Sequence, residues 1–245
     1  MDKILDDNLA YLGLTQIQKQ YDALEKAAAT KRLAPAAFFA ELVACEVATR
    51  RERAAQRRVR AAHFPVIKTL DTFKWSIPTL INRELIQYLF TLKFIDERRN
   101  VGLLGKSGVG KTHLLTALGY NACLKGYNVR FESAIAIINN LKNAQTNGSF
   151  LRILRNYTAP ELLCIDEIGF LPIDQEGGNL LFQVISQRYE TGSTAITSNL
   201  DYDQWTSVFN NDAAMVSALL DRLLHHCDSI LIDGPSVRTG LEEKR

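Results

Sequence analysis

The stretch GKSGVGKT, residues 105–112, has the residue types and spacing of a phosphate-binding loop. It matches the pattern GxxxxGK(S/T), in which glycines let successive backbone N–H groups turn toward phosphate oxygens. Lys111 is placed to reach the β and γ phosphates of a nucleotide, and Thr112 is placed to bind Mg²⁺ through its hydroxyl. An ordinary glycine-rich turn is the alternative interpretation. The residues expected to contact the nucleotide are Gly105, Ser107, Gly108, Val109, Gly110, Lys111, Thr112 and His113.

Two carboxylates follow the most apolar segment of the chain, ELLCIDEI at residues 161–168. An uninterrupted apolar run of this length predicts a strand that is buried on both faces. Asp166 fits the carboxylate on the Mg²⁺ side of a nucleotide site. Glu167, one residue later, is placed to orient and deprotonate an attacking water. A solvated acidic corner is the alternative, and the phosphate loop upstream favours the catalytic interpretation.

Three further polar residues are candidates for the same site. Asn199 ends another apolar segment, TAITSN, where its side chain would hold the water near the γ-phosphate, although asparagine at a strand end is often only a turn residue. Arg222, in SALLDRLLHH, and Arg238, in GPSVR, would stabilise transition-state charge if they approach that phosphate. Ordinary surface arginines are the alternative. An arginine contributed by a neighbouring subunit would couple hydrolysis to assembly.

Strands that alternate with helices are expected to position these residues. The alternation predicts a mostly parallel sheet covered by helices on both faces, with one helix over residues 111–125 ended by Gly126. The expected strands are residues 100–105, 128–133, 161–168, 193–199 and 229–234.

The N-terminal part of the chain has a different pattern. Residues 1–62 have helical spacing of apolar residues, and Pro35 is expected in the first turn of a helix that runs through residue 60. Residues 63–78 contain two prolines and predict an extended linker, and residues 79–98 return to helical spacing. These helices would form either a small bundle or a partner-binding module. The expected domains are residues 1–65, a linker and lead-in helix at 66–98, and an ATPase domain at 99–245.

Composition restricts the classes of protein that the chain can belong to. The sequence has 245 residues, is 47% hydrophobic and carries a net charge of +2. It is therefore not a polycation, and any nucleic-acid surface must come from local clusters of basic residues. The N-terminus has no apolar signal-peptide core, and the four cysteines form no CxxC pair, so we expect a cytoplasmic protein with reduced thiols.

Two clusters of basic residues are candidate contacts to the DNA backbone. The first set would share one face of a helix, and the second lies between the second and third expected strands. A solvated helix face is the alternative for the first. Backbone contacts of this kind predict weak sequence preference and a steep dependence of affinity on salt. The candidates are Arg50, Arg53, Arg57 and Arg60 in the first set, and Lys142, Arg152 and Arg155 in the second.

Over roughly residues 60–240 the chain resembles the IstB-type transposition helpers, AAA+ ATPases related to the DnaC helicase loaders. The resemblance rests on joint motifs that are more specific than the phosphate loop alone. They are GKSGVGKTHLL, LLCIDEIGFLPID, GNLLFQVISQRYE, TAITSNLDYDQW, ALLDRLLHH and GPSVR. The sequence departs from the family pattern at Lys106 and Ser107, where two prolines are common, and at Val237, where tyrosine is usual.

The resemblance implies a fold and a set of roles. The fold would be an α/β AAA+ P-loop domain with a five-stranded, mostly parallel sheet, no C-terminal lid domain and a small all-helical N-terminal domain. Lys111 and Thr112 would be the Walker A pair, and Asp166 and Glu167 the Walker B pair. Asn199 would be the sensor asparagine. Arg222 would be an arginine finger acting in trans, and Arg238 the second-sensor arginine.

The resemblance also implies an activity. Such proteins of bacterial insertion sequences bind ATP and Mg²⁺, form homo-oligomers with active sites between subunits, assemble on double-stranded DNA, deform it and present it to a partner transposase. One alternative is a helicase loader that binds a replicative helicase and prefers single strands. Another is a metabolic P-loop kinase, which would need a lid segment that we do not find and which the Asp166–Glu167 pair suits less well than water activation.

Overall fold

The computed structural model describes residues 1–236, and Arg238 lies outside the described residues. The chain divides into two compact units, Met1–Arg57 and Arg58–Arg245, and the division falls within helix α3 (Pro35–Ala62). Helix α3 begins at Pro35, as predicted. Among residues 1–236, no helix is long and apolar enough to cross a membrane.

The first unit contains α1 (Lys3–Tyr11), α2 (Thr15–Lys31) and the greater part of α3. Its small core is built from Leu9, Ile17 and Leu42 with partly buried neighbours. The buried carboxylate of Glu46 accepts hydrogen bonds from two backbone N–H groups at the start of α2 and from Arg50. Burial alone would raise the pKa of Glu46, but these hydrogen bonds outweigh it and lower the pKa.

The second unit is built on a parallel sheet. Its strand order is β2-β3-β4-β1-β5, and the four pairings of neighbouring strands in this sheet are parallel, which confirms the predicted sheet. Parallel strands that are buried on both faces need covering helices on each side. Between β5 and residue 236 no helical lid follows. The strands are β1 (Asn100–Leu104), β2 (Val129–Ser133), β3 (Leu162–Ile168), β4 (Ser193–Ser198) and β5 (Cys227–Leu231).

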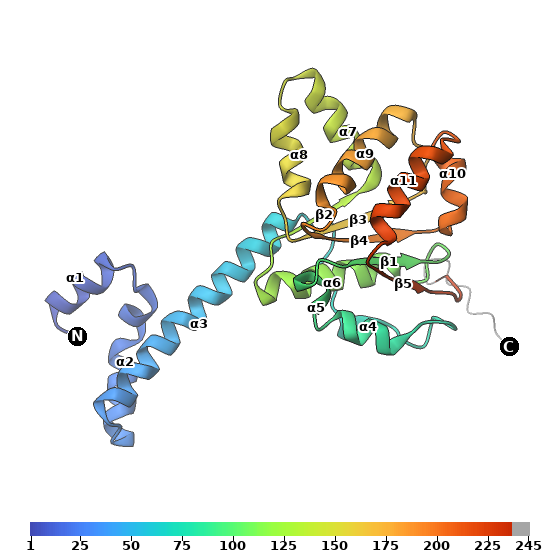
Figure 1. Ribbon diagram of the computed structural model, residues 1–245. Helices are drawn as coiled ribbons and strands as arrows, with labels where there is room; N and C mark the ends of the chain where they lie inside the picture. The colour runs from blue at the N-terminus through green and yellow to red at the C-terminus, as the bar shows by residue number, and fades with distance from the viewer. Residues whose placement is uncertain (237–245) are drawn as a thin grey trace. The chain divides into compact units, whose positions relative to one another are not determined.

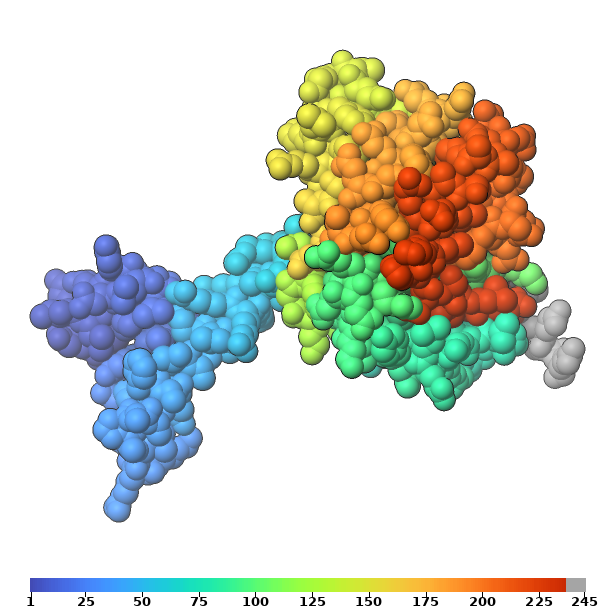
Figure 2. Space-filling view, in the orientation of Figure 1, coloured from blue at the N-terminus to red at the C-terminus, as the bar shows by residue number. Residues whose placement is uncertain are grey.

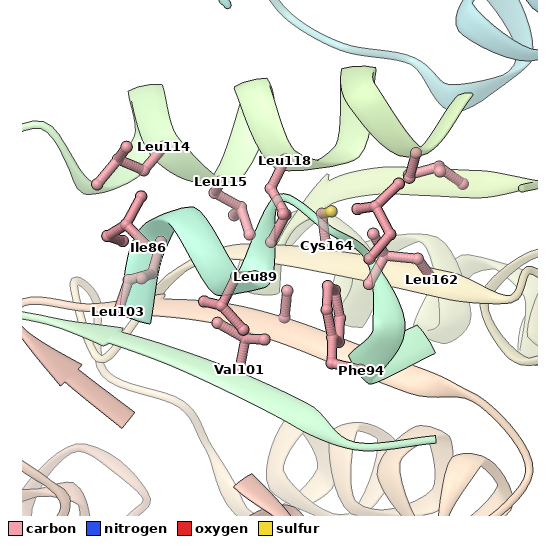
Figure 3. Close-up of a cluster of buried hydrophobic side chains, with 14 of the residues drawn as sticks. Ile86, Leu89, Phe94, Val101, Leu103, Leu114, Leu115, Leu118, Leu162 and Cys164 are labelled. Atoms are coloured by element: carbon pink, nitrogen blue, oxygen red, sulfur yellow. The ribbon is translucent and has the colours of Figure 1, made fainter. Parts of the chain in front are cut away.

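Helices cover both faces of this sheet (Figure 1). On one face lie α4 (Arg83–Leu89), α5 (Lys93–Asp96) and α6 (Lys111–Lys125). In Figure 3, Leu114, Leu115 and Leu118 of α6 lie across from Ile86 and Leu89 of α4 in this core. The other face is covered by α7 (Ala134–Thr146), α8 (Phe150–Thr158), α9 (Gln175–Arg188), α10 (Trp205–Val208) and α11 (Ala213–Leu224).

Two predicted elements differ from the structure. The helix expected over residues 79–98 is two short helices. It starts late because the N–H groups of Thr79 and Leu80 both donate to the Asp233 carbonyl. It is interrupted between α4 and α5 because Leu92 adopts a left-handed conformation (φ 67°). The last strand, expected at 229–234, ends at Leu231. Asp233 instead forms an antiparallel bridge with Leu80, so the two segments lie side by side (Figure 2, red beside teal).

Arg188, at the end of α9, joins several elements at the edge of the sheet where the strands begin. Its side chain is 1% exposed, and its guanidinium donates six hydrogen bonds to neutral oxygens: the Thr194 hydroxyl and five backbone carbonyls. Burial lowers the pKa of Arg188 to about 10, so the group stays charged at neutral pH. The carbonyls belong to Tyr157, Thr158, Pro160, Glu161 and Ser193.

We predict that Arg188→Met lowers the free energy of unfolding by about 3 kcal/mol or more, because it leaves several buried carbonyls without donors. Urea denaturation of the full-length protein measures the change. Arg152→Met, at an exposed position on α8, is the matched control and should stay within about 0.5 kcal/mol of the wild type. A loss below about 1 kcal/mol for Arg188→Met would show that these bonds contribute little.

Candidate nucleotide site

The phosphate loop connects β1 to α6 and depends on its glycines. Gly105, Gly108 and Gly110 have φ angles of 141°, 85° and 103°, a region that disfavours residues with a side chain. A Cβ atom would also collide with the carbonyl of Ile232 at Gly105, with the Ser236 side chain at Gly108 and with the Phe73 ring at Gly110. The loop therefore has the cradle that a polyphosphate requires, with the N-terminus of a long helix behind it.

Lys111 lies across this loop. It is the first residue of α6 and is 8% exposed. Its Nζ donates to the carbonyl oxygens of Gly105, at 2.5 Å, and of Lys106, at 2.7 Å. These two bonds hold the ammonium group inside the loop, where a phosphate oxygen can replace a carbonyl as acceptor.

The carboxylate of Asp166 meets two hydroxyl groups from different elements. Its Oδ1 accepts from Thr112 of α6 at 3.0 Å and from Thr197 of β4 at 2.5 Å. Asp166 is 7% exposed. A hydroxyl and a carboxylate oxygen in contact are ligands that Mg²⁺ prefers, so the donor set fits this metal ion.

Glu167 and Asn199 lie at the same cavity as the phosphate loop. The cavity has a volume of about 490 Å³, and its lining includes Ser107 to His113, Glu167, Thr197 and Asn199. Glu167 is exposed and has a positive φ of 60°, which is uncommon for a residue with a side chain. The structure thus brings together residues that are far apart in the sequence, as the parallel sheet requires.

The segment expected to be a linker forms one wall of this cavity. Pro65, Val66, Phe73 and Ile77 contribute apolar surface to it. The 3₁₀ turn η1 (Leu70–Thr72) is attached to α6 through His113.

His113 makes that attachment with several contacts. Its Nε2 lies 2.9 Å from the Thr69 carbonyl and 3.3 Å from the Thr72 hydroxyl, and its ring meets the Phe73 ring edge-on at 5.4 Å. Sequence reasoning expected a linker here and missed this wall. Its signals were the apolar residues of 63–78 and the similarity of FPVIKTLDTFKW to the lead-in segment of the family.

Arg222 does not line the cavity of its own chain. It lies on α11, where its guanidinium stacks over the Phe182 ring at 4.8 Å and donates to the Ala218 carbonyl at 2.8 Å. Arg238 lies outside the described residues, although Ser236, two residues earlier, approaches the loop at Gly108.

The basic residues proposed to contact DNA differ in their surroundings. Arg50 is bound to Glu46 and to the Gly13 carbonyl, and Arg53 reaches the Thr15 hydroxyl at 3.4 Å. Lys142 is paired with Asp174 at 2.6 Å and with Glu176 at 3.4 Å. Arg57, Arg60, Arg152 and Arg155 are exposed, as are Arg50 and Arg53, whereas Lys142 is half-buried.

Comparison with models of protein families shows which family the chain belongs to. A family model described as IstB-like ATP binding protein matches residues 7–244. The chain belongs to the IstB-like ATP-binding protein family. It is 34% identical over 234 residues to an ATP-binding protein of insertion sequence IS5376 from Geobacillus stearothermophilus, covering 96% of this chain and 92% of that one.

Two further relatives have similar names. An ATP-binding protein of insertion sequence IS232 from Bacillus thuringiensis is 36% identical over 96% of this chain and 93% of its own. One of insertion sequence IS21 from Pseudomonas aeruginosa is 35% identical over 97% of this chain and 88% of its own.

Solved structures support the AAA+ fold of this family member. The DnaC helicase loader superposes with a TM-score of 0.57 at 20% identity, covering 67% of this chain and 96% of that one. AMPPCP-bound DnaA from Aquifex aeolicus superposes with a TM-score of 0.56 at 20% identity, covering 70% of this chain and 51% of that one.

We predict that Lys111→Ala weakens ATP binding at least about tenfold, because a charge-assisted hydrogen bond to phosphate contributes about 1.5–3 kcal/mol. Titration with a fluorescent ATP analogue measures the affinity. Lys106→Ala is the matched control within the loop and should change the affinity less than about twofold. The Lys106 side chain is 79% exposed, and its ion pair with Asp233, at 3.6 Å, lies at the surface, where such pairs contribute little. Equal losses in both variants would contradict the assignment of Lys111.

Proposed function

We propose that this protein is an ATP-dependent, DNA-binding regulator of transposition whose ATPase sites lie between subunits. The observation that carries the proposal is that Lys111, Thr112, Glu167 and Asn199 line one cavity and that Asp166 accepts a hydrogen bond from Thr112 beside it, in a member of the IstB-like family. The names of the relatives, ATP-binding proteins of insertion sequences, support the link to transposition.

The chain's residues divide the binding of ATP and Mg²⁺ among them. The loop N–H groups and Lys111 hold the phosphates. Thr112 and Asp166 would hold Mg²⁺, which would supply positive charge to the phosphates. The apolar wall of Val66, Phe73 and Ile77 suits the purine ring, since nucleotide pockets combine apolar surface with a few fixed polar groups.

Hydrolysis is assigned to Glu167 and Asn199. Glu167 accepts a proton from the attacking water as that water's oxygen bonds to the γ-phosphorus and the bond from phosphorus to the ADP oxygen breaks. Asn199 holds the same water through its side-chain amide. Both residues line the cavity beside the phosphate loop, which supports this assignment.

Arg222 is assigned to the site of a neighbouring subunit. It is absent from the lining of its own cavity and lies on a different helix, stacked on Phe182. A guanidinium delivered in trans would stabilise charge on the γ-phosphate only after subunits assemble. Arg238, by its motif, is assigned to the nucleotide as a second sensor.

Double-stranded DNA is the proposed partner that organises the assembly for a transposase. The net charge of +2 requires local basic clusters, and Arg57, Arg60, Arg152 and Arg155 are exposed. Lys142 is already neutralised by two carboxylates, so the exposed arginines carry more of the contact. Contacts to phosphates alone would position the protein with little sequence preference.

Mixing two inactive variants tests the proposed trans site. Glu167→Gln should bind ATP but lose at least about 100-fold in hydrolysis, the typical contribution of a general base, and Arg222→Ala should lose a comparable factor. An equimolar mixture on duplex DNA should recover about a quarter of the wild-type rate, since half of the sites are intact and half of the neighbours supply Arg222. Phosphate release measures each rate.

Asp221→Asn, the neighbouring position on α11, is the matched control and should keep the wild-type rate. A mixture that stays as inactive as its components, while both variants assemble on DNA, would contradict action in trans. Hydrolysis by Arg222→Ala at the wild-type rate would remove Arg222 from the site altogether.

A further inference from the structure

The two acidic residues of β3 lie at an irregularity in the sheet. Ile165 pairs with Ile196 of β4, and the next pair is Ile168 with Ser198. Two residues of β3, Asp166 and Glu167, therefore face a single residue of β4, Thr197, which is the arrangement of a β-bulge. A bulge re-aims side chains, and here it lets two adjacent carboxylates serve one site, whereas a regular strand would point them to opposite faces.

The side chain of Thr197 holds both halves of this bulge. Its Oγ1 donates to Asp166 Oδ1 at 2.5 Å and accepts the Glu167 backbone N–H at 2.9 Å. Thr197 is 1% exposed, so the hydroxyl cannot exchange these partners for bulk water. The Thr197 hydroxyl thus acts both as a donor, to Asp166, and as an acceptor, from Glu167.

The backbone of Glu167 needs such a partner. Its φ of 60° costs free energy for a residue with a side chain and persists only where surrounding contacts fix it. The hydrogen bond from the Glu167 N–H to Thr197 is a contact of this kind, and it acts on the residue that directs the catalytic carboxylate into the cavity.

We propose that Thr197 is a positioning residue for ATP hydrolysis: its hydroxyl fixes Asp166 and sets the backbone turn that aims Glu167 at the attacking water. Thr197 acts through these two residues and through Thr112, which shares Asp166 Oδ1 with it. The inference rests on the proposed ATPase function and assigns a role to a residue within β4, in addition to that of Asn199 just after the strand.

Thr197→Val tests the inference because valine keeps the shape and removes the hydroxyl. We expect the kcat for ATP to fall about 10- to 100-fold, the range typical of lost partners behind a metal site. The affinity for ATP without Mg²⁺ should change less than about threefold, because the phosphate loop is untouched. Thr197→Ser restores the hydroxyl and should recover most of the wild-type kcat.

Hydrogen exchange of the nucleotide-free protein gives a readout that does not depend on activity. Thr197→Val should speed exchange of the Glu167 amide, which has lost its acceptor, and Thr197→Ser should keep it slow. The matched control is Thr194→Val, which removes another buried hydroxyl of β4 at the opposite end of the strand, where it accepts from Arg188. It should lower stability without lowering kcat.

Two results would overturn the inference. One is a kcat for Thr197→Val within about threefold of the wild type. The other is an equal loss in Thr197→Ser, which would show that packing, not the hydroxyl, matters. A wild-type protein that does not hydrolyse ATP on DNA would overturn the proposed function instead. The exchange measurement, which needs no nucleotide, would still decide whether Thr197 holds the turn.

Discussion

The position of β4 between β3 and β1 is the constraint on which the site depends. Parallel strands end at the same edge of a sheet, so the phosphate loop after β1, the acids of β3 and Asn199 after β4 meet there. The crossover helices that parallel pairing requires bury both faces of the sheet and hold these ends rigidly. Function at this edge is therefore a consequence of strand order.

The two ends of the same strands perform different tasks. Where the strands begin, Arg188 binds carbonyls of neighbouring segments and ties them together. Where they end, the sheet departs from regularity: β3 bulges opposite Thr197, and Glu167 adopts a left-handed conformation. A strained backbone such as that of Glu167 persists only where the surrounding structure holds it. The hydrogen bonds of Arg188 at the other end of the strands are suited to contribute to this.

The sequence predicted the parts of the site that follow from local pattern. The GKSGVGKT motif between an expected strand and helix located the loop, and the apolar run before Asp166 located β3, because burial on both faces leaves a clear apolar signature. The five parallel strands and the helix start at Pro35 are confirmed. The roles of the individual site residues remain proposals.

Features that depend on contacts between distant segments escaped sequence reasoning. The bulge arises from the pairing of residues about 30 positions apart, such as Ile165 with Ile196, and no local pattern reports it. The cavity wall of residues 65–77 has no regular period, so it was expected to be a linker. The end of β5 was misplaced because Asp233 pairs with Leu80, more than 150 residues earlier in the chain.

Assembly on DNA is best measured as the mass of the protein by light scattering, with and without ATP–Mg²⁺ and a duplex of several dozen base pairs. Glu167→Gln should be measured in parallel, because it holds ATP without hydrolysing it. We expect large assemblies only when nucleotide and duplex are both present, and we expect them to persist in the variant. A protein that stays monomeric on duplex DNA with ATP would contradict sites shared between subunits, and preferential assembly on single strands would favour a helicase loader.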